Sequence, residues 1–179
     1  MIYPLHYVII KKRDNAGDYM EELLKRIYSK KKITASLKII SHASVVLGLV
    51  SYISILIWSY LASPLLAVKL LVSAGVPYVV VTVARSLISA PRPYELYDFY
   101  EVKPKDKKGR SFPSRHTFSA FVIATLAYTV SVWLCIALLA VGVSLALARV
   151  LLGIHFIRDV VAGALIGVLS GIIGILIIM

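Results

Sequence analysis

The chain has 179 residues, a formal net charge of +11 at pH 7 and 59% hydrophobic residues, with a mean hydropathy of +0.85. A soluble domain of this length cannot bury so much apolar surface, so the composition excludes a soluble globular protein and predicts a membrane protein. The single cysteine, Cys135, excludes a disulfide framework and a thiolate metal site, and its apolar surroundings predict a small core residue. Residues 1–10 lack a basic stretch ahead of their short apolar run, so we expect no cleavable signal peptide.

Residues 1–38 form a basic segment that is predicted to lie on the membrane surface. Asp18 can cap a helix that has Glu21 three residues later. Beyond Asp18, apolar residues follow one helical stripe (Tyr19, Met20, Leu23, Leu24, Ile27 and Tyr28) and charged residues the opposite one (Glu21, Glu22, Lys25, Arg26 and Lys30). We expect an interfacial amphipathic helix, with the lysines at 30–32 meeting anionic lipid; docking of this helix on a partner protein is the alternative.

Apolar runs suited to transmembrane helices, which need about 20 residues, begin at residue 39. The first two cover 39–61 and 65–90 and are bounded by prolines. The next run, 117–152, could form one helix or two helices joined by a tight turn. A single helix would separate His116 from His155 by about 55 Å, more than the thickness of a bilayer. We therefore expect a hairpin near Ser131, Val132 and Trp133.

A last span is predicted over residues 157–179, where Gly163, Gly167 and Gly171 recur at intervals of four. Such spacing lets neighbouring helices approach closely, and we assign these glycines to packing. The predicted fold class is all-α: a multi-pass membrane helical bundle of about five transmembrane helices plus the interfacial helix. Its two parts are the basic segment 1–38 and the membrane-embedded domain 39–179.

The basic residues also predict an orientation. Residues 1–38 hold nine Lys and Arg against four Asp and Glu, and residues 91–116 hold seven against four. The positive-inside rule places both segments in the cytoplasm, with Trp58, Tyr60 and Trp133 at the far interface. We expect a multi-pass protein of a bacterial plasma membrane whose site faces the cytoplasm.

Polar residues interrupt the apolar second half in three clusters. They are Arg85 with Arg92; Ser114 with Arg115 and His116; and Arg149 with His155 and Asp159. The hairpin brings all three to one side of the membrane. Charged groups near hydrocarbon are costly and are retained where they meet a partner or ligand. Several arginines around one carboxylate would repel one another unless an anion lay among them, so a phosphate is the predicted ligand.

His155 and Asp159 are four residues apart, so on a helix they would lie within hydrogen-bond reach. The carboxylate would fix the tautomer of the imidazole and leave the other ring nitrogen free to attack, with His116 as a proton donor. A metal site is the competing interpretation, which the surrounding arginines disfavour. His6 and His42 have no such company and are predicted to be a surface residue and a helix-boundary residue.

The order Arg85-(x6)-Arg92-Pro93, Pro113-Ser114-Arg115-His116 and Arg149-(x5)-His155-(x3)-Asp159 resembles a known three-part signature. This is the signature of the type 2 phosphatidic acid phosphatase superfamily, which is related to vanadium haloperoxidases: K-x6-RP, PSGH and SR-x5-H-x3-D. The resemblance covers residues 65–179. Arg85 replaces a lysine, Arg115 a glycine and Ala148 a serine of the pattern. Arg115 would either contact a second phosphate or point outward.

The resemblance implies a metal-independent lipid phosphate phosphatase without a cofactor. His155 would form a phosphohistidine, Asp159 would orient it and His116 would protonate the leaving group, while Arg85, Arg92, Ser114, Arg115 and Arg149 would hold phosphoryl oxygens. The implied substrates are phosphatidate, phosphatidylglycerophosphate or a polyprenyl diphosphate such as undecaprenyl diphosphate, and no nucleic acid is expected as a partner. The alternative is a non-catalytic phospholipid-binding or carrier protein on the same fold, in which the three departures would mark lost catalysis.

Overall fold

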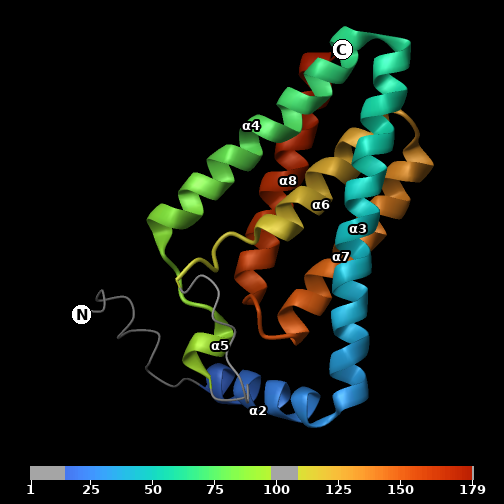
Figure 1. The fold of residues 1–179 in the computed structure, drawn as a ribbon. Helices are drawn as coiled ribbons and strands as arrows, with labels where there is room; N and C mark the ends of the chain where they lie inside the picture. Colours follow the sequence, from blue (N-terminus) through green and yellow to red (C-terminus); the bar gives the residue numbers. More distant parts are fainter. Residues whose placement is uncertain (1–14, 98–108, 179) are drawn as a thin grey trace.

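The computed structural model describes residues 15–97 and 109–178, and these ranges contain helices and connecting turns but no strand. In chain order the helices are α2 (Asn15–Ser29), α3 (Lys31–Ala62), α4 (Pro64–Ile88), α5 (Pro93–Leu96), α6 (Arg115–Leu126), the 3-10 turn η1 (Ala127–Thr129), α7 (Val132–Leu151) and α8 (Ile157–Ile178) (Figure 1). The chain is therefore an all-α bundle, as the sequence predicts.

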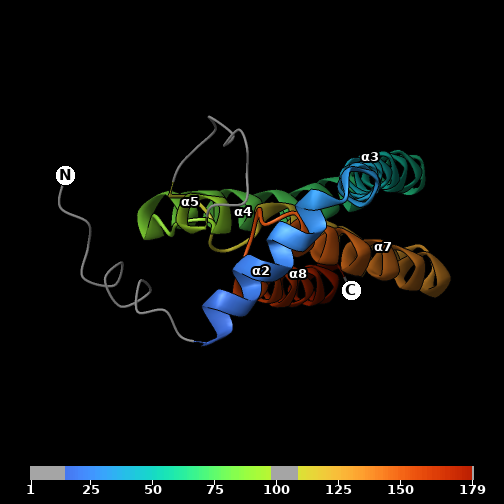
Figure 2. The same cartoon turned by 90° about the horizontal axis from the view of Figure 1, so that it is seen from below.

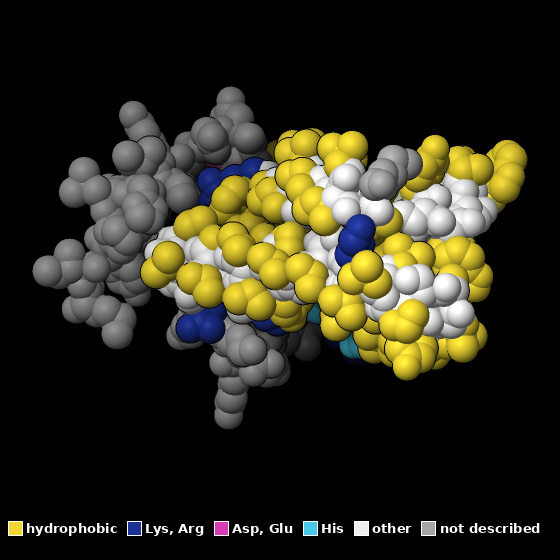
Figure 3. Space-filling view, turned by 90° about the horizontal axis from the view of Figure 1, so that it is seen from above, with side chains coloured by type: hydrophobic (Ala, Val, Ile, Leu, Met, Phe, Trp, Pro, Cys, Tyr) yellow, Lys and Arg dark blue, Asp and Glu magenta, His cyan; other side chains and the backbone are white. Residues whose placement is uncertain are grey.

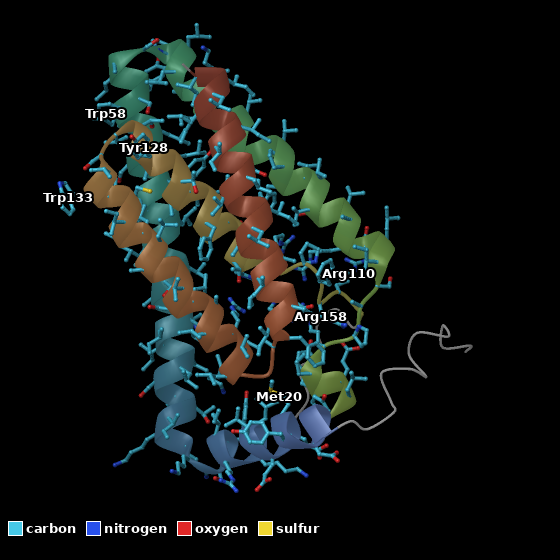
Figure 4. The ribbon with its side chains drawn as sticks, turned by 180° about the vertical axis from the view of Figure 1, so that it is seen from behind. Met20, Trp58, Arg110, Tyr128, Trp133 and Arg158 are labelled. Carbon is cyan, nitrogen blue, oxygen red and sulfur yellow. The ribbon has the colours of Figure 1, made fainter. Side chains whose placement is uncertain are left out.

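Four helices of the described chain, α3, α4, α7 and α8, are long and apolar enough to cross a membrane. Their outward faces carry large exposed hydrophobic side chains, and the surface seen from above is mostly hydrophobic (Figure 3). The protein is a multi-pass membrane protein. Figure 4 places Trp58, Tyr128 and Trp133 toward one end of the bundle, Met20 of α2 at the other end, and Arg110 and Arg158 between them.

The predicted count of about five transmembrane helices is not confirmed, because among the described residues α6 is shorter than a full crossing. This helix has only 12 residues, and η1 adds three before the chain turns at Val130 and Ser131. It is nonetheless the most enclosed helix of the bundle, contacting α3, α4, α7 and α8 and burying Phe118, Val122 and Leu126. A half-length helix can lie in the membrane here because longer neighbours cover its backbone.

The turn between α6 and α7 confirms the predicted hairpin, since α7 begins at Val132. The first span differs from its prediction: α3 begins at Lys31, so the helix runs through the expected boundary at residues 38 and 39 without a break. His42 consequently lies inside α3, where its Nδ1–H donates to the Lys38 carbonyl at 2.8 Å. Cys135 is only partly buried on α7 rather than a core residue. The expected role of His6 lies outside the described residues.

Glycines of α8 form the tightest contact in the bundle. A Cβ on Gly163 would lie 2.5 Å from the Ser114 carbonyl oxygen, and one on Gly167 would lie 2.6 Å from the Phe118 carbonyl oxygen. A Cβ on Gly171 would lie 2.5 Å from Cβ of Thr125. The predicted packing role of these glycines is confirmed, because α6 approaches the α8 backbone where side chains are absent.

The amphipathic helix α2 lies across the end of the bundle that carries the polar clusters (Figures 1 and 2). It begins at Asn15, so Asp18 lies in its first turn rather than at its cap. Leu24 is fully buried in a cluster with Tyr94 of α5. The apolar stripe thus packs in part on α5, and the position of this helix in the headgroup region stays a prediction.

Candidate active site

The three polar clusters meet at the end of the bundle covered by α2. Arg92 is the N-cap residue of α5, and the Glu95 carboxylate accepts bonds from the backbone N–H groups of Arg92 and Gly109, at 3.3 Å and 3.1 Å. The Ser111 N–H donates to the Ala90 carbonyl at 2.9 Å. These bonds tie the turn after α4 to the segment before α6, which brings the first two clusters together.

His155, Asp159 and Ser111 form a buried polar group. The Ser111 hydroxyl donates a short hydrogen bond to Asp159 Oδ2 and lies 3.3 Å from His155 Nδ1. His155 Nδ1 lies 3.6 Å from the same carboxylate oxygen, and the Phe156 N–H donates to it at 3.0 Å. All three side chains are at most 2% exposed. Nδ1 of His155 thus faces the hydroxyl and the carboxylate, which leaves Nε2 available for other partners.

Burial lowers the pKa of His155 below the ordinary value of histidine, and the positive charge of Arg92 lowers this pKa further. The hydrogen bond and negative charge of Asp159 oppose the shift without reversing it. The imidazole is therefore neutral at neutral pH and keeps a lone pair for reaction.

The turn between α7 and α8 fixes His155 next to Arg149. Gly153 adopts φ of +59°, a conformation that favours glycine, and lets the chain reverse direction within a few residues. The N–H groups of Ile154 and His155 then both donate to the Arg149 carbonyl, at 3.0 Å and 3.3 Å. The sequence predicted these residues as neighbours, and the turn brings them together.

The start of α6 is joined to α8 through its backbone. The Ser114 N–H donates to the Asp159 carbonyl at 2.9 Å, and the Ser114 hydroxyl lies 3.0 Å from the Thr117 hydroxyl. Ser114 is fully buried, and both its N–H and its hydroxyl group have hydrogen-bond partners within the protein. His116 follows two residues later and is close enough to Arg149 and His155 for their charges to act on it.

Four arginines lie around the His155–Asp159–Ser111 group, and the described residues offer these arginines few hydrogen-bond partners. Arg85 donates to the Arg110 carbonyl and is near enough to Arg92, Arg115 and Asp159 for electrostatic interaction. Within the described residues, the Nε atoms of Arg92 and Arg149 are buried without a hydrogen-bond partner. Buried donors without partners are costly. Donors from several arginines that face one place are suited to binding an anion.

Arg115 lies at the edge of the site. Its guanidinium is 5.4 Å from the centroid of the Tyr78 ring on α4, a cation–π arrangement. Its charge still acts on Arg85 and His116. Arg115, which replaces the glycine of the pattern, therefore contacts α4 through Tyr78 and lies beside the other arginines of the site.

An apolar cavity of about 420 Å³ adjoins His116. It lies between α3, α4 and α6, with a few residues of each helix on its walls: Ser44, Gly48 and Tyr52; Leu71, Gly75 and Tyr78; and Phe118, Ser119 and Ile123. Along α6 the lining extends from His116 to Ile123. The cavity is therefore an apolar space inside the bundle that reaches the polar end at His116.

Sequence reasoning missed Ser111, although it lies three residues before the predicted Ser114. A small polar residue between Arg110 and Phe112, in the same short loop as Ser114, was the available signal. Sequence reasoning also missed the cavity, which no motif marks. Among the described residues, no group of three or more His, Cys, Asp and Glu side chains is arranged to hold a metal ion.

A membrane bundle with two histidines, a carboxylate and converging arginines defines a phosphate-binding class of membrane protein. The chain belongs to the PAP2 superfamily, whose sequence pattern matches residues 66–179. It is 33% identical to the lipid A 1-phosphatase of Porphyromonas gingivalis over 82 residues, which is 44% of this chain and 18% of that protein. The match thus spans less than a fifth of that relative's length.

Two solved structures share the fold. LpxE of Aquifex aeolicus has a TM-score of 0.65 and 25% identity, and the alignment covers 86% of this chain and 93% of that one. A transmembrane PAP2 type phosphatidylglycerolphosphate phosphatase from Bacillus subtilis has a TM-score of 0.69 and 19% identity. That alignment covers 93% of this chain and 87% of the other.

Proposed function

We propose that this protein is a metal-independent lipid phosphatase that acts through a phosphohistidine at His155. The observation that carries the proposal is a buried His155–Asp159–Ser111 group close to arginines, two of which, Arg92 and Arg149, have a buried Nε without a hydrogen-bond partner among the described residues. An apolar cavity that reaches His116 lies next to this group. Membership of the PAP2 superfamily and phosphatase relatives support the same activity.

In the first step His155 Nε2 attacks phosphorus and the bond from phosphorus to the lipid oxygen breaks. The negative charge of the bound phosphate offsets the positive charges around His116 and favours its protonated form. Protonated His116 then gives its proton to the leaving oxygen, and Asp159 balances the charge that develops on the His155 ring. In the second step His116 takes a proton from water, the hydroxide attacks phosphorus, and the bond between nitrogen and phosphorus breaks. Arg85, Arg92 and Arg149 stabilise the negative charge of the phosphoryl oxygens in both steps.

The cavity suits the apolar tail of the substrate, because its walls are mainly aliphatic and aromatic and it opens toward His116. The candidate substrates are phosphatidate, phosphatidylglycerophosphate, a polyprenyl diphosphate and the 1-phosphate of lipid A, the last two classes carrying larger lipids. In this proposal Arg115 contacts an outer phosphate or headgroup, since it lies on Tyr78 at the cavity wall. The basic residues of the N-terminal segment bind anionic lipid at the same membrane surface.

The test is phosphate release by the purified protein from these four lipids, with and without EDTA. We expect release from at least one lipid, unchanged in EDTA, and inhibition by vanadate, which mimics five-coordinate phosphorus. Loss of activity in EDTA that a divalent cation restores would refute the metal-independent mechanism. Binding of lipids without any phosphate release would favour the carrier alternative.

The low pKa of His155 adds a pH dependence to this test. A nucleophile whose pKa lies below the ordinary value of about 6.5 stays neutral as the pH falls through that value. We therefore expect the acid limb of kcat/KM to lie below pH 6.5. An acid limb well above that value would contradict the assignment of His155 as the unprotonated group.

A further inference from the structure

The helix α2 contacts two parts of the site that are far apart in the sequence. The Tyr28 hydroxyl donates to the Leu152 carbonyl at 3.1 Å, across 124 residues of sequence. Leu24, one turn earlier on the same helix, is completely buried against Tyr94. One contact reaches the turn before His155, and the other reaches the residue two positions after Arg92.

The contact with Leu152 bears on the position of His155. Leu152 is the C-cap residue of α7, and only Gly153 and Ile154 separate it from His155. The positive φ of Gly153 makes this a tight reversal, so a displacement of the Leu152 carbonyl is transmitted to the histidine. The hydrogen bond from Tyr28 ties that carbonyl to α2.

The contact with Tyr94 bears on the position of Arg92. The Arg92 guanidinium lies 5.6 Å from the centroid of the Tyr94 ring, a cation–π arrangement. Within the described chain the Nε atom of Arg92 is buried without a hydrogen-bond partner, and the Tyr94 ring is one restraint on this guanidinium. Leu24 packs in one hydrophobic cluster with Tyr94, and Met20 and Tyr28 pack against this cluster.

We propose that α2 is a positioning element of the active site: Tyr28 positions His155 through Leu152, and Leu24 positions Arg92 through Tyr94. The inference rests on the proposed function, because it assigns consequences to His155 and Arg92. The PAP2 match begins at residue 66, so α2 lies outside the part of the chain that defines the family. The opposite face of α2 carries the exposed Glu22–Arg26 ion pair and is turned away from these contacts.

The test compares variants of the full-length protein with dioctanoyl phosphatidate in mixed micelles. Tyr28→Phe removes one hydrogen bond and keeps the ring, so we expect kcat to fall about fivefold with KM within about twofold of wild type. Leu24→Ala should instead raise KM about fivefold, because displacement of Arg92 weakens phosphate binding in the ground state as well as in the transition state. Leu24→Met, which nearly conserves volume, should restore KM.

Tyr19→Phe is the matched control, since Tyr19 lies on α2 and is 71% exposed. It should leave kcat, KM and the melting temperature unchanged. Wild-type kcat and KM in Tyr28→Phe would overturn the positioning role of Tyr28, as would a loss that only follows the fraction of unfolded protein. Equal changes of kcat and KM in both variants would show a general structural role and refute the proposal.

His155→Ala in the same assay separates this inference from the proposed function. If His155→Ala is inactive and Tyr28→Phe is normal, the positioning role fails and the phosphatase mechanism stands. If His155→Ala remains active, the phosphohistidine mechanism fails and the role of Tyr28 fails with it. The KM of Leu24→Ala then decides the remaining contact with Arg92 by itself.

Discussion

The two sides of α6 differ in how closely their neighbours approach. On one side the glycines of α8 bring backbone against backbone, and the Ser114 N–H bonds to the Asp159 carbonyl. On the other side α3 and α4 stand away and leave an apolar cavity that reaches His116. One short helix therefore serves two needs. Its tight side fixes polar groups with the precision that catalysis requires, while its open side leaves room for a lipid.

The largest effect is expected for His155→Ala, which removes the proposed nucleophile from the tight side. Phosphate release should fall at least 1000-fold, a scale typical for loss of an essential catalytic group. The variant should stay folded, because the glycine contacts between α6 and α8 do not involve this side chain. Activity within about tenfold of wild type, measured with any of the candidate lipids, would remove His155 from the mechanism.

Gly163→Ala should break the tight side itself. The new Cβ would lie 2.5 Å from the Ser114 carbonyl oxygen, which is backbone and cannot move aside without shifting α6. We expect a loss of about 1–3 kcal/mol in stability and a fall in activity of more than tenfold. Gly48→Ala is the control, since a Cβ there meets nothing within 4 Å. Equal melting temperatures for the two variants in detergent would contradict the assignment of close packing to Gly163.

Ser111→Ala tests the polar group that the tight side supports. It removes the hydroxyl that bonds to Asp159 and lies near His155 Nδ1, so the tautomer and direction of the imidazole are less fixed. We expect kcat to fall about tenfold with little change in KM. Ser119→Ala, in the cavity lining on α6, is the control. A KM effect without a kcat effect would move Ser111 from positioning to substrate binding.

Gly75→Leu should fill the open side. A Cβ on Gly75 meets nothing within 4 Å and the residue lines the cavity, so we expect the larger side chain to extend into the cavity. We expect kcat/KM to fall about tenfold for long-chain lipid phosphates and to change little for a short-chain, water-soluble phosphate. Val80→Leu, at a position of α4 that is 61% exposed, should affect neither. Equal losses for both substrate classes would argue against a tail in this cavity.

The smallest effect is expected for Arg115→Gly, which restores the residue of the family pattern. Its guanidinium lies on Tyr78 beside the cavity, so we expect a loss of a few-fold, greater for diphosphate than for monophosphate lipids. Glycine also weakens the start of a helix, so Arg115→Ala separates loss of the charge from added backbone freedom. Equal effects of Arg115→Gly on both substrate classes would exclude a contact with a second phosphate.

Much of the site could be predicted because its residues are local in sequence and chemically distinctive. Arg85, Arg92, His116, Arg149, His155 and Asp159 interrupt apolar runs, and the length limit of a helix in a bilayer requires the hairpin that brings them together. The glycines at intervals of four predicted a close helix contact for a similar reason. The chemical roles of the arginines, the two histidines and Asp159 stay predictions, as does the cytoplasmic orientation.

Other features depend on three-dimensional distances that periodicity does not encode. The helix α6 can be short because longer helices enclose it, whereas its apolar sequence alone suggested a full span. Ser111 meets Asp159 across 48 residues and Tyr28 meets Leu152 across 124, and in each case an ordinary serine or tyrosine gains its significance from its partner. Hydrophobic spacing and charge cost are properties of the chain itself, so the sequence determined the membrane bundle and the residues at its polar end. Side-chain partners and empty space belong to the packed fold, so only the tertiary structure decided the positioning contacts and the cavity.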